Sequence, residues 1–330
     1  MLIRATDTGL ACAAGGFHID PWRPSATALV THAHADHARP GSDVYYAAAP
    51  GVGLLRKRLG DAADIRPVDW GERLSFEDTV VSFHPAGHVL GSAQIRIESA
   101  QGVWVVSGDY KRDPDPTCAP FEVVPCDTFI TEATFALPVY RWRPGSETAR
   151  EIHDWWQGNR EQGRPSVLFC YALGKAQRVL AELMAYTDAT VFVHGAVEAL
   201  VEVYREAGVE MLPTEKVDLR QQRDYAGELV IAPPGAAGST WMRRFRSAST
   251  GFCSGWMRIR GQRRRRGYDR GFVLSDHADW PSLLRTIDET GASRVLATHG
   301  HTDALVRLLR EHGVDASALE TAYEGSGDDQ

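Results

Sequence analysis

The segment LVTHAHADHARPGS, residues 29–42, gathers three histidines and an aspartate within six positions, directly after a short apolar run. His32 and His34 are two residues apart in an extended run, so we expect their side chains to project on one side. Asp36 and His37 follow where we expect the chain to turn into a helix, and they can point to a different centre. Because these four side chains cannot all converge on one ion, the spacing favours two metals. Imidazole and carboxylate ligands without thiolate fit zinc, and they also permit manganese or iron.

Three further candidate ligands occur downstream, and each lies at the end of an apolar run. His88 falls between two β-rich runs, Asp109 ends VWVVSGD, and His299 ends RVLATHG. Polar side chains that close neighbouring strands collect at one edge of a sheet. A carboxylate such as Asp109 could there bridge two metals. The sequence therefore predicts a binuclear metal centre assembled from strand ends.

The elements that must position these residues change in character along the chain. The first 135 residues alternate short β-rich runs with Gly, Pro and Asp turns, and residues 50–60, PGVGLLRKRLG, form the clearest helix. Strands and helices then alternate, which predicts a small parallel sheet, before strand-and-histidine character returns. We therefore expect a catalytic domain of residues 1–146 and 269–330, interrupted by an inserted domain at residues 147–268.

The composition is that of an ordinary globular protein: 43% hydrophobic and 24% charged residues, without an apolar run of membrane-spanning length. Five widely spaced cysteines with no C-x-x-C pair argue against a disulfide framework and favour the cytoplasm. The net charge of −7 hides a basic segment, residues 243–270, with ten arginines against one acid. We expect this segment, including Arg263 and Arg264, to contact an anionic polymer; a plain basic surface loop is the alternative.

The motifs THAHADH, AGHVLGSA and SGD carry a resemblance to the sequential metal motifs of the metallo-β-lactamase superfamily. The resemblance implies an αββα sandwich and a specific ligand set. One metal would take His32, His34 and His88, the other would take Asp36, His37 and His299, and Asp109 would bridge them. Asp20, in FHIDPW, resembles an early aspartate that supports the site without binding metal.

Two later motifs and the insertion between them resemble the β-CASP group of nucleases. TEATF supplies Glu132 and SDHAD supplies His277, which match motifs A and B of that group, and His299 matches motif C. GGFHIDPWRP, SGDYKRDPDPTCAPFE and YALGKAQR further resemble the bacterial DNA-ligase-associated exonuclease family. That resemblance implies a nuclease that acts with a ligase and a helicase in DNA repair.

The leading hypothesis is therefore a two-metal phosphodiesterase acting on DNA, as a single strand or at ends. Asp36, Glu132 and His277 are the candidate catalytic residues, with His277 oriented by Glu132 to stabilise charge or protonate the leaving oxygen. Zinc is the expected metal, with manganese or iron as alternatives. Candidate substrate contacts, besides the two arginines above, are Ser92, Tyr110 and Lys175.

Three other hypotheses remain. A histidine at motif C is typical of RNA-processing members of the group, so His299 keeps an RNA nuclease open. A silent nucleic-acid-binding subunit is less favoured because every expected ligand is present. A small-molecule hydrolase is poorly supported, because the inserted domain would then have no evident function.

Overall fold

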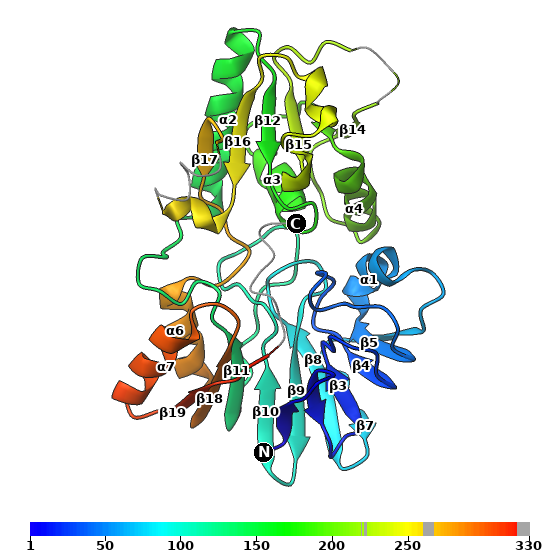
Figure 1. Ribbon diagram of the computed structural model, residues 1–330, viewed down its shortest axis with the longest axis vertical. Helices are drawn as coiled ribbons and strands as arrows, with labels where there is room; N and C mark the ends of the chain where they lie inside the picture. Colours follow the sequence, from blue (N-terminus) through cyan, green and yellow to red (C-terminus); the bar gives the residue numbers. More distant parts are fainter. Residues whose placement is uncertain (219, 221–222, 260–266, 322–330) are drawn as a thin grey trace. The chain divides into compact units, whose positions relative to one another are not determined.

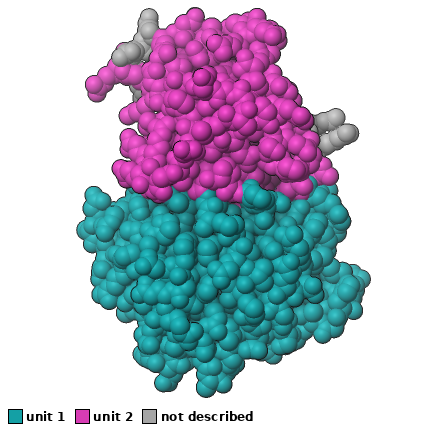
Figure 2. Space-filling view, turned by 180° about the vertical axis from the view of Figure 1, so that it is seen from behind, with its two compact units in different colours: residues 1–114, 118–141, 277–327 teal, residues 115–117, 142–276, 328–330 magenta. Residues whose placement is uncertain are grey.

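The structure is a computed structural model of the 330-residue chain, and it describes residues 1–218, 220, 223–259 and 267–321. The chain forms two compact units, coloured separately in Figure 2. The first holds Met1–Pro114, Cys118–Arg141 and the residues from His277 onward; the second holds Asp115–Thr117 and Trp142–Asp276. The expected domain boundaries, residues 147 and 268, lie a few residues inside the second unit, and as boundaries they stay a prediction.

Two sheets make up the first unit (Figure 1). The six-stranded sheet has the order β1 (Ile3–Ala5), β2 (Leu10–Cys12), β3 (Phe17–Ile19), β4 (Thr27–Leu29), β5 (Val44–Ala48) and β6 (Ile65–Val68). The seven-stranded sheet has the order β19 (Asp315–Ala318), β18 (Arg294–Thr298), β11 (Thr128–Glu132), β10 (Gly102–Val106), β9 (Ala93–Ser99), β8 (Thr79–Pro85) and β7 (Leu74–Phe76).

An apolar core lies between the two sheets, where Phe17 of one sheet and Val106 of the other are both buried. A second core lies on the other face of the seven-stranded sheet. Val105 points there because successive side chains of a strand alternate in direction. Helices α6 (Trp280–Thr290) and α7 (Thr302–Glu311) cover this face.

Helix α1 (Val52–Leu59) packs beside β6 and buries Leu54 and Leu55. A single 3-10 turn, η1 (Ala49–Gly51), leads into it, so the helix expected at residues 50–60 is present and begins slightly later.

The second unit is built on an all-parallel sheet. Its order is β14 (Thr214–Lys216), β13 (Val191–Val193), β15 (Leu229–Ala232), β12 (Ser166–Phe169), β16 (Ser249–Cys253) and β17 (Arg270–Phe272). Helix α2 (Gly145–Glu161) precedes β12, α3 (Lys175–Leu183) follows β12, and α4 (Gly195–Glu206) follows β13. The short 3-10 turns of this unit are η2 (Pro234–Ala236), η3 (Thr240–Arg244) and η4 (Gly255–Arg258).

The predicted fold class is confirmed, since a helix-covered sandwich is accompanied by a separate parallel sheet. Among the described residues, none of the helices combines the length and apolarity that crossing a bilayer requires.

We predict that Gly91→Ala destabilises the first unit more than Gly71→Ala does. Both glycines have a left-handed backbone, with φ of +71° and +74°, so each alanine carries a strain of about 1–2 kcal/mol. A Cβ on Gly91 would also lie 2.1 Å from the backbone nitrogen of Gly51, whereas nothing lies within 4 Å of one on Gly71. Denaturant unfolding of both variants measures the difference, and equal losses of unfolding free energy would contradict the role of this close approach.

Candidate metal centre

The histidine-rich segment follows β4 and forms a loop. Val30 donates its backbone N–H to Tyr46 of β5, which ties the start of the loop to the sheet. His37 and Ala38 both donate backbone N–H groups to the His34 carbonyl, which closes a tight turn. The segment was expected to turn into a helix at this point; it remains a turn, and the histidines still converge.

The three downstream candidates meet this loop. His88 lies in the loop between β8 and β9, Asp109 follows β10, and His299 follows β18. His299 has a left-handed backbone with φ +59°, a conformation that a non-glycine residue adopts at a cost. The next residue must be glycine, since a Cβ on Gly300 would lie 2.5 Å from the Ala133 carbonyl oxygen.

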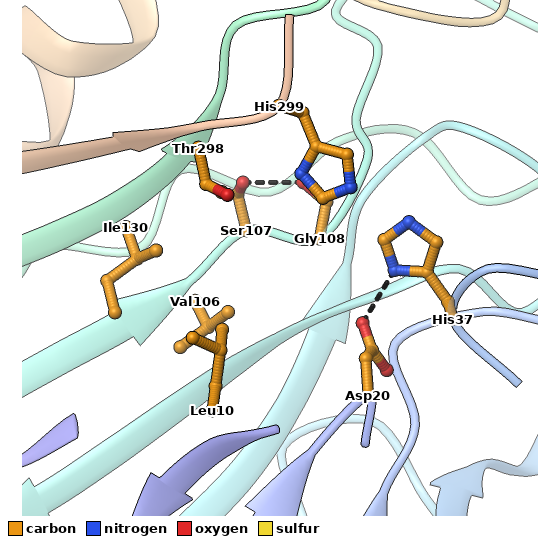
Figure 3. Close-up of a pocket in the computed structure, with 9 residues that line it drawn as sticks. All are labelled: Leu10, Asp20, His37, Val106, Ser107, Gly108, Ile130, Thr298 and His299. Atoms are coloured by element: carbon orange, nitrogen blue, oxygen red, sulfur yellow. Dashed lines mark hydrogen bonds and ion pairs between the residues drawn. The ribbon is translucent and has the colours of Figure 1, made fainter. Parts of the chain in front are cut away.

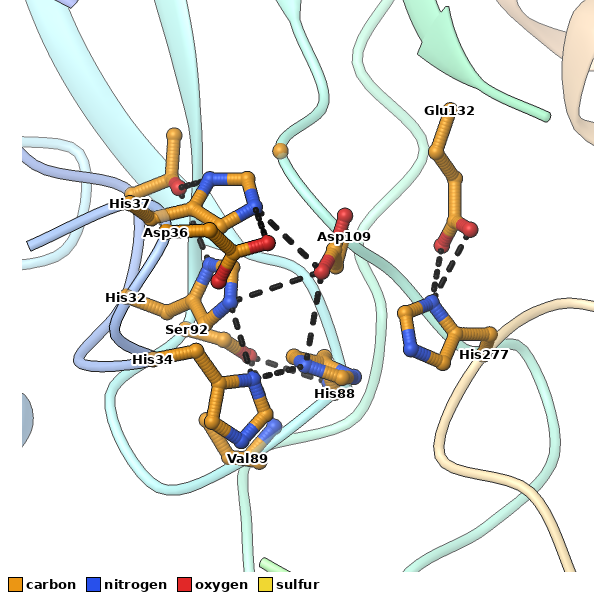
Figure 4. A network of polar contacts seen from close by, with 12 residues as sticks. His32, His34, Asp36, His37, His88, Val89, Ser92, Asp109, Glu132 and His277 are labelled. Carbon is orange, nitrogen blue, oxygen red and sulfur yellow. Dashed lines mark hydrogen bonds and ion pairs between the residues drawn. The ribbon is translucent and has the colours of Figure 1, made fainter. Parts of the chain in front are cut away.

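One carboxylate oxygen, Oδ2 of Asp109, lies among three imidazole rings. It is 3.5 Å from Nε2 of His32, 3.5 Å from Nε2 of His37 and 3.8 Å from Nε2 of His88. Nδ1 of His34 lies 3.1 Å from Nε2 of His32 and 3.0 Å from Nε2 of His88. Figure 4 shows these donor atoms turned toward a common centre beside Asp109.

The donors form two adjacent groups that fit a pair of metal ions. His32, His34, His88 and Asp109 make one group, and Asp36, His37 and His299 make the other. In each group the donor atoms lie within 4.8 Å of one another, and donors bound to a zinc ion at about 2.0–2.1 Å would be roughly 3.3 Å apart. The other oxygen of Asp109, Oδ1, is buried without a hydrogen-bond partner among the described residues.

The electrostatics favour a cation at this place. Burial alone would lower the pKa of His37, but the carboxylates of Asp109, Asp36 and Asp20 raise it well above its ordinary value. Burial would raise the pKa of Asp109, yet His37 and other neighbouring histidines hold it well below its ordinary value. The carboxylates around His37 therefore favour positive charge at this place.

The surroundings of three other rings favour the neutral form. Burial lowers the pKa of His32 well below its ordinary value, and burial together with His88 lowers that of His34 to about 3. Burial likewise lowers the pKa of His299. Neutral imidazole is the form that binds metal, so these rings are in the state that coordination requires.

Asp20 and Thr31 orient the ligand rings, and the role of Thr31 was not anticipated from the sequence. Asp20 accepts hydrogen bonds from the Thr31 backbone N–H at 2.7 Å and the Thr31 hydroxyl at 2.6 Å. Because that hydroxyl proton goes to Asp20, Nδ1 of His32, 3.0 Å away, must donate to Thr31, which leaves Nε2 to face the centre. His37 Nδ1 is likewise 2.7 Å from Asp20. The only sequence signal for Thr31 is its position as the first residue of the motif THAHADH.

A small cavity lies beneath this region, between the metal loops and the core (Figure 3). Its lining residues are Leu10, Asp20, His37, Val106, Ser107, Gly108, Ile130, Thr298 and His299. Polar groups therefore line the side toward the ligands, and apolar strand residues line the side toward the core.

Glu132 and His277 form a second buried pair next to Asp109. His277 Nδ1 lies 2.9 Å and 3.1 Å from the two Glu132 oxygens, and Glu132 also accepts the Tyr110 backbone N–H at 2.8 Å. The Glu132 side chain is 1% exposed and the His277 side chain 12%, so the imidazole is the member that solvent reaches. Its ring centre is 4.7 Å from that of His88.

The structure thus brings together all the predicted ligands, the supporting Asp20 and the Glu132–His277 pair. Their roles in metal binding and catalysis stay predictions.

The candidate substrate-contact residues Ser92, Tyr110 and Lys175 are all buried. Ser92 is buried and accepts the backbone N–H groups of His88 and Val89, so it shapes the His88 loop. Tyr110 is fully buried, and burial raises the pKa of its hydroxyl. Lys175 is 3% exposed, and its ammonium lies 3.4 Å from Asp276 and above the Tyr171 ring.

A substrate contact by any of these three residues stays a prediction and would require a change in burial. Arg263 and Arg264 lie outside the described residues.

The chain is similar in sequence to several known proteins. No family profile matches it. A protein of Opitutus terrae described as a probable DNA ligase is 32% identical over 308 residues, which is 92% of this chain and 30% of that protein. A ribonuclease of Thermus thermophilus is 27% identical over 52% of this chain and 45% of its own length. An endoribonuclease of Neurospora crassa is 31% identical over 37% of this chain and 14% of its own length.

The fold agrees with these likenesses. A crystal structure of a protein of unknown function from Enterococcus faecalis superposes with a TM-score of 0.59 at 13% identity, over 82% of this chain and 74% of that one. Together with the grouped histidines and carboxylates, the nuclease relatives confirm the predicted resemblance to the metallo-β-lactamase superfamily and its β-CASP group. The chain spans less than half the length of these curated relatives.

We predict that Asp20→Asn weakens metal binding by about 10–100-fold, because an amide has a single acceptor oxygen, whereas the carboxylate accepts the Thr31 backbone N–H at Oδ1 and faces the Thr31 hydroxyl and His37 Nδ1 with Oδ2. Competition with a chromophoric chelator, with zinc and with manganese, measures the affinity. Asp7→Asn is the matched control, since Asp7 is exposed and remote from the ligands in sequence. Equal metal affinity in both variants would exclude a supporting role for Asp20.

Proposed function

We propose that the chain is a two-metal phosphodiesterase that cleaves nucleic acid. The observation that carries this proposal is the position of Asp109, whose Oδ2 atom lies within 3.8 Å of three imidazole nitrogens from both donor groups. Next to it stands a histidine–carboxylate pair, Glu132 and His277, with one member reachable by solvent. Metal ligands beside a proton donor suit hydrolysis of a phosphodiester.

The metals would be held by His32, His34 and His88 on one side and by Asp36, His37 and His299 on the other, with Asp109 shared. When bound, two divalent ions supply positive charge that activates water and stabilises phosphoryl oxygens. Zinc suits these ligands, and manganese or iron are compatible with them.

The task of the protein side chains is to hold and deliver protons. Glu132 fixes the His277 ring through Nδ1, which turns the other ring nitrogen away from Glu132. A carboxylate in this position stabilises the imidazolium form, so His277 is suited to donate a proton to the leaving oxygen. The Tyr110 backbone N–H donates to Oε1 of Glu132 and helps to hold this carboxylate in place.

For the substrate we propose DNA, cleaved from an end in a repair reaction that also involves a DNA ligase and a helicase. The support is the likeness along 92% of the chain to a protein described as a probable DNA ligase, which favours work beside a ligase. The second candidate is RNA, favoured by the relatives described as a ribonuclease and an endoribonuclease and by His299 at motif C.

We expect purified protein with zinc or manganese to shorten end-labelled single-stranded DNA step by step, and His277→Gln to slow the cleavage by about 10²–10⁴-fold, the range for loss of a general acid. His312→Gln is the control, since this exposed histidine hydrogen-bonds to the Leu308 carbonyl of α7 and is not one of the candidate site residues, so the rate should stay unchanged. Denaturing gels with end-labelled DNA and RNA in parallel measure both products and rates.

Internal cuts in RNA alone would replace the DNA proposal by the RNA candidate. Absence of cleavage on both polymers, in protein that carries metal, would overturn the phosphodiesterase proposal itself.

A further inference from the structure

The last turn of α1 carries three consecutive cations, Arg56, Lys57 and Arg58, which we call the α1 basic turn. All three side chains are exposed, and no carboxylate of the described residues lies within ion-pair distance of them. Some other exposed arginines of the same unit have acidic partners: Arg66 pairs with Asp64, and Arg73 with Glu98. The α1 basic turn is thus a local excess of positive charge in a chain whose net charge is −7.

Both ends of helix α1 lie near loops that carry candidate metal ligands. At the start of the helix, Gly51 packs directly against Gly91, in the loop that carries His88. At the other end, partial desolvation lowers the Arg58 pKa, and the Asp36 carboxylate opposes this shift. Helix α1 therefore begins against the His88 loop, and its last turn brings Arg58 within electrostatic reach of the candidate ligand Asp36.

Helix stability explains only part of this arrangement. Cations in the last turn of a helix interact favourably with its dipole, by about 0.3–1 kcal/mol each. That effect requires no proximity to a metal centre. A substrate strand whose scissile phosphate reaches the metals has further phosphates a few ångströms along, and unpaired cations at the rim complement their charge.

We propose that the α1 basic turn binds backbone phosphates of the nucleic-acid strand next to the one being cleaved. This inference rests on the proposed function and adds to it a binding surface in the metal-bearing unit, separate from the arginine-rich segment. Contacts to phosphate carry no base information, so the surface serves DNA and RNA alike.

The test is the salt dependence of binding of a fluorescent single-stranded oligonucleotide to the full chain with calcium in place of the catalytic metal. In R56Q/K57Q/R58Q we expect the slope of log affinity against log salt to fall in magnitude by about 2, because each phosphate contact on a single strand contributes roughly 0.7. Affinity near 0.1 M salt should fall on the order of 100-fold. R56Q/K57Q leaves Arg58 beside Asp36 and should lower the slope by about 1.4.

Two further variants identify the cause. R285Q/R294Q/R307Q removes the same charge from exposed positions on α6, β18 and α7 and should keep the wild-type slope. R56K/R58K keeps the positive charges and should bind as tightly as wild-type protein, unlike R56Q/K57Q/R58Q. This comparison separates loss of charge from loss of the arginine side chains themselves.

An unchanged slope in R56Q/K57Q/R58Q, while wild-type protein binds and cleaves the strand, would overturn the inference and leave the proposed function standing. If wild-type protein neither binds nor cleaves DNA or RNA, both the proposed function and this inference fail.

Discussion

The structure depends on one electrostatic constraint: a buried carboxylate, Asp109, lies among imidazole rings that burial keeps mostly neutral. Such a concentration of donors is stable only if positive charge is present. Although burial alone would lower the pKa of His37, the carboxylates of Asp109, Asp36 and Asp20 raise it, which shows how strongly this place favours positive charge. Divalent ions held by these residues would supply such charge. The left-handed backbone at His299 and the close approach of Gly91 to Gly51 are both consistent with a loop geometry set by this centre.

Hydrogen bonds behind the ligands decide which ring nitrogen faces the metals. Asp20 takes the Thr31 proton, Thr31 then accepts from His32, and His37 also points its Nδ1 at Asp20. The same logic operates at the second pair, where a backbone N–H from Tyr110 and the ring of His277 share Glu132. His32, His37 and His277 are therefore each oriented by a buried partner, which would reduce the entropy lost when metal or substrate binds.

Much of this centre could be predicted because metal ligands occur as short motifs at strand ends. The pairing of His32 with His34, and the placing of Asp109 and His299 after strands, follow from local sequence. Residues whose role depends on distant packing could not be found in this way: nothing local indicates that the Thr31 hydroxyl meets Asp20. For the same reason Tyr110 and Lys175 were expected to meet substrate, although long-range packing buries both. The turn at His37 also differs from the expected helix, because ligand convergence outweighs local helix propensity.

The central claim is that two metal ions share Asp109. Anomalous diffraction from crystals grown with manganese or zinc, recorded on both sides of the metal absorption edge, tests it most directly. The account predicts two anomalous peaks per chain, one among His32, His34 and His88 and one among Asp36, His37 and His299, with Asp109 touching both. A single peak, or peaks that do not contact Asp109, would contradict it.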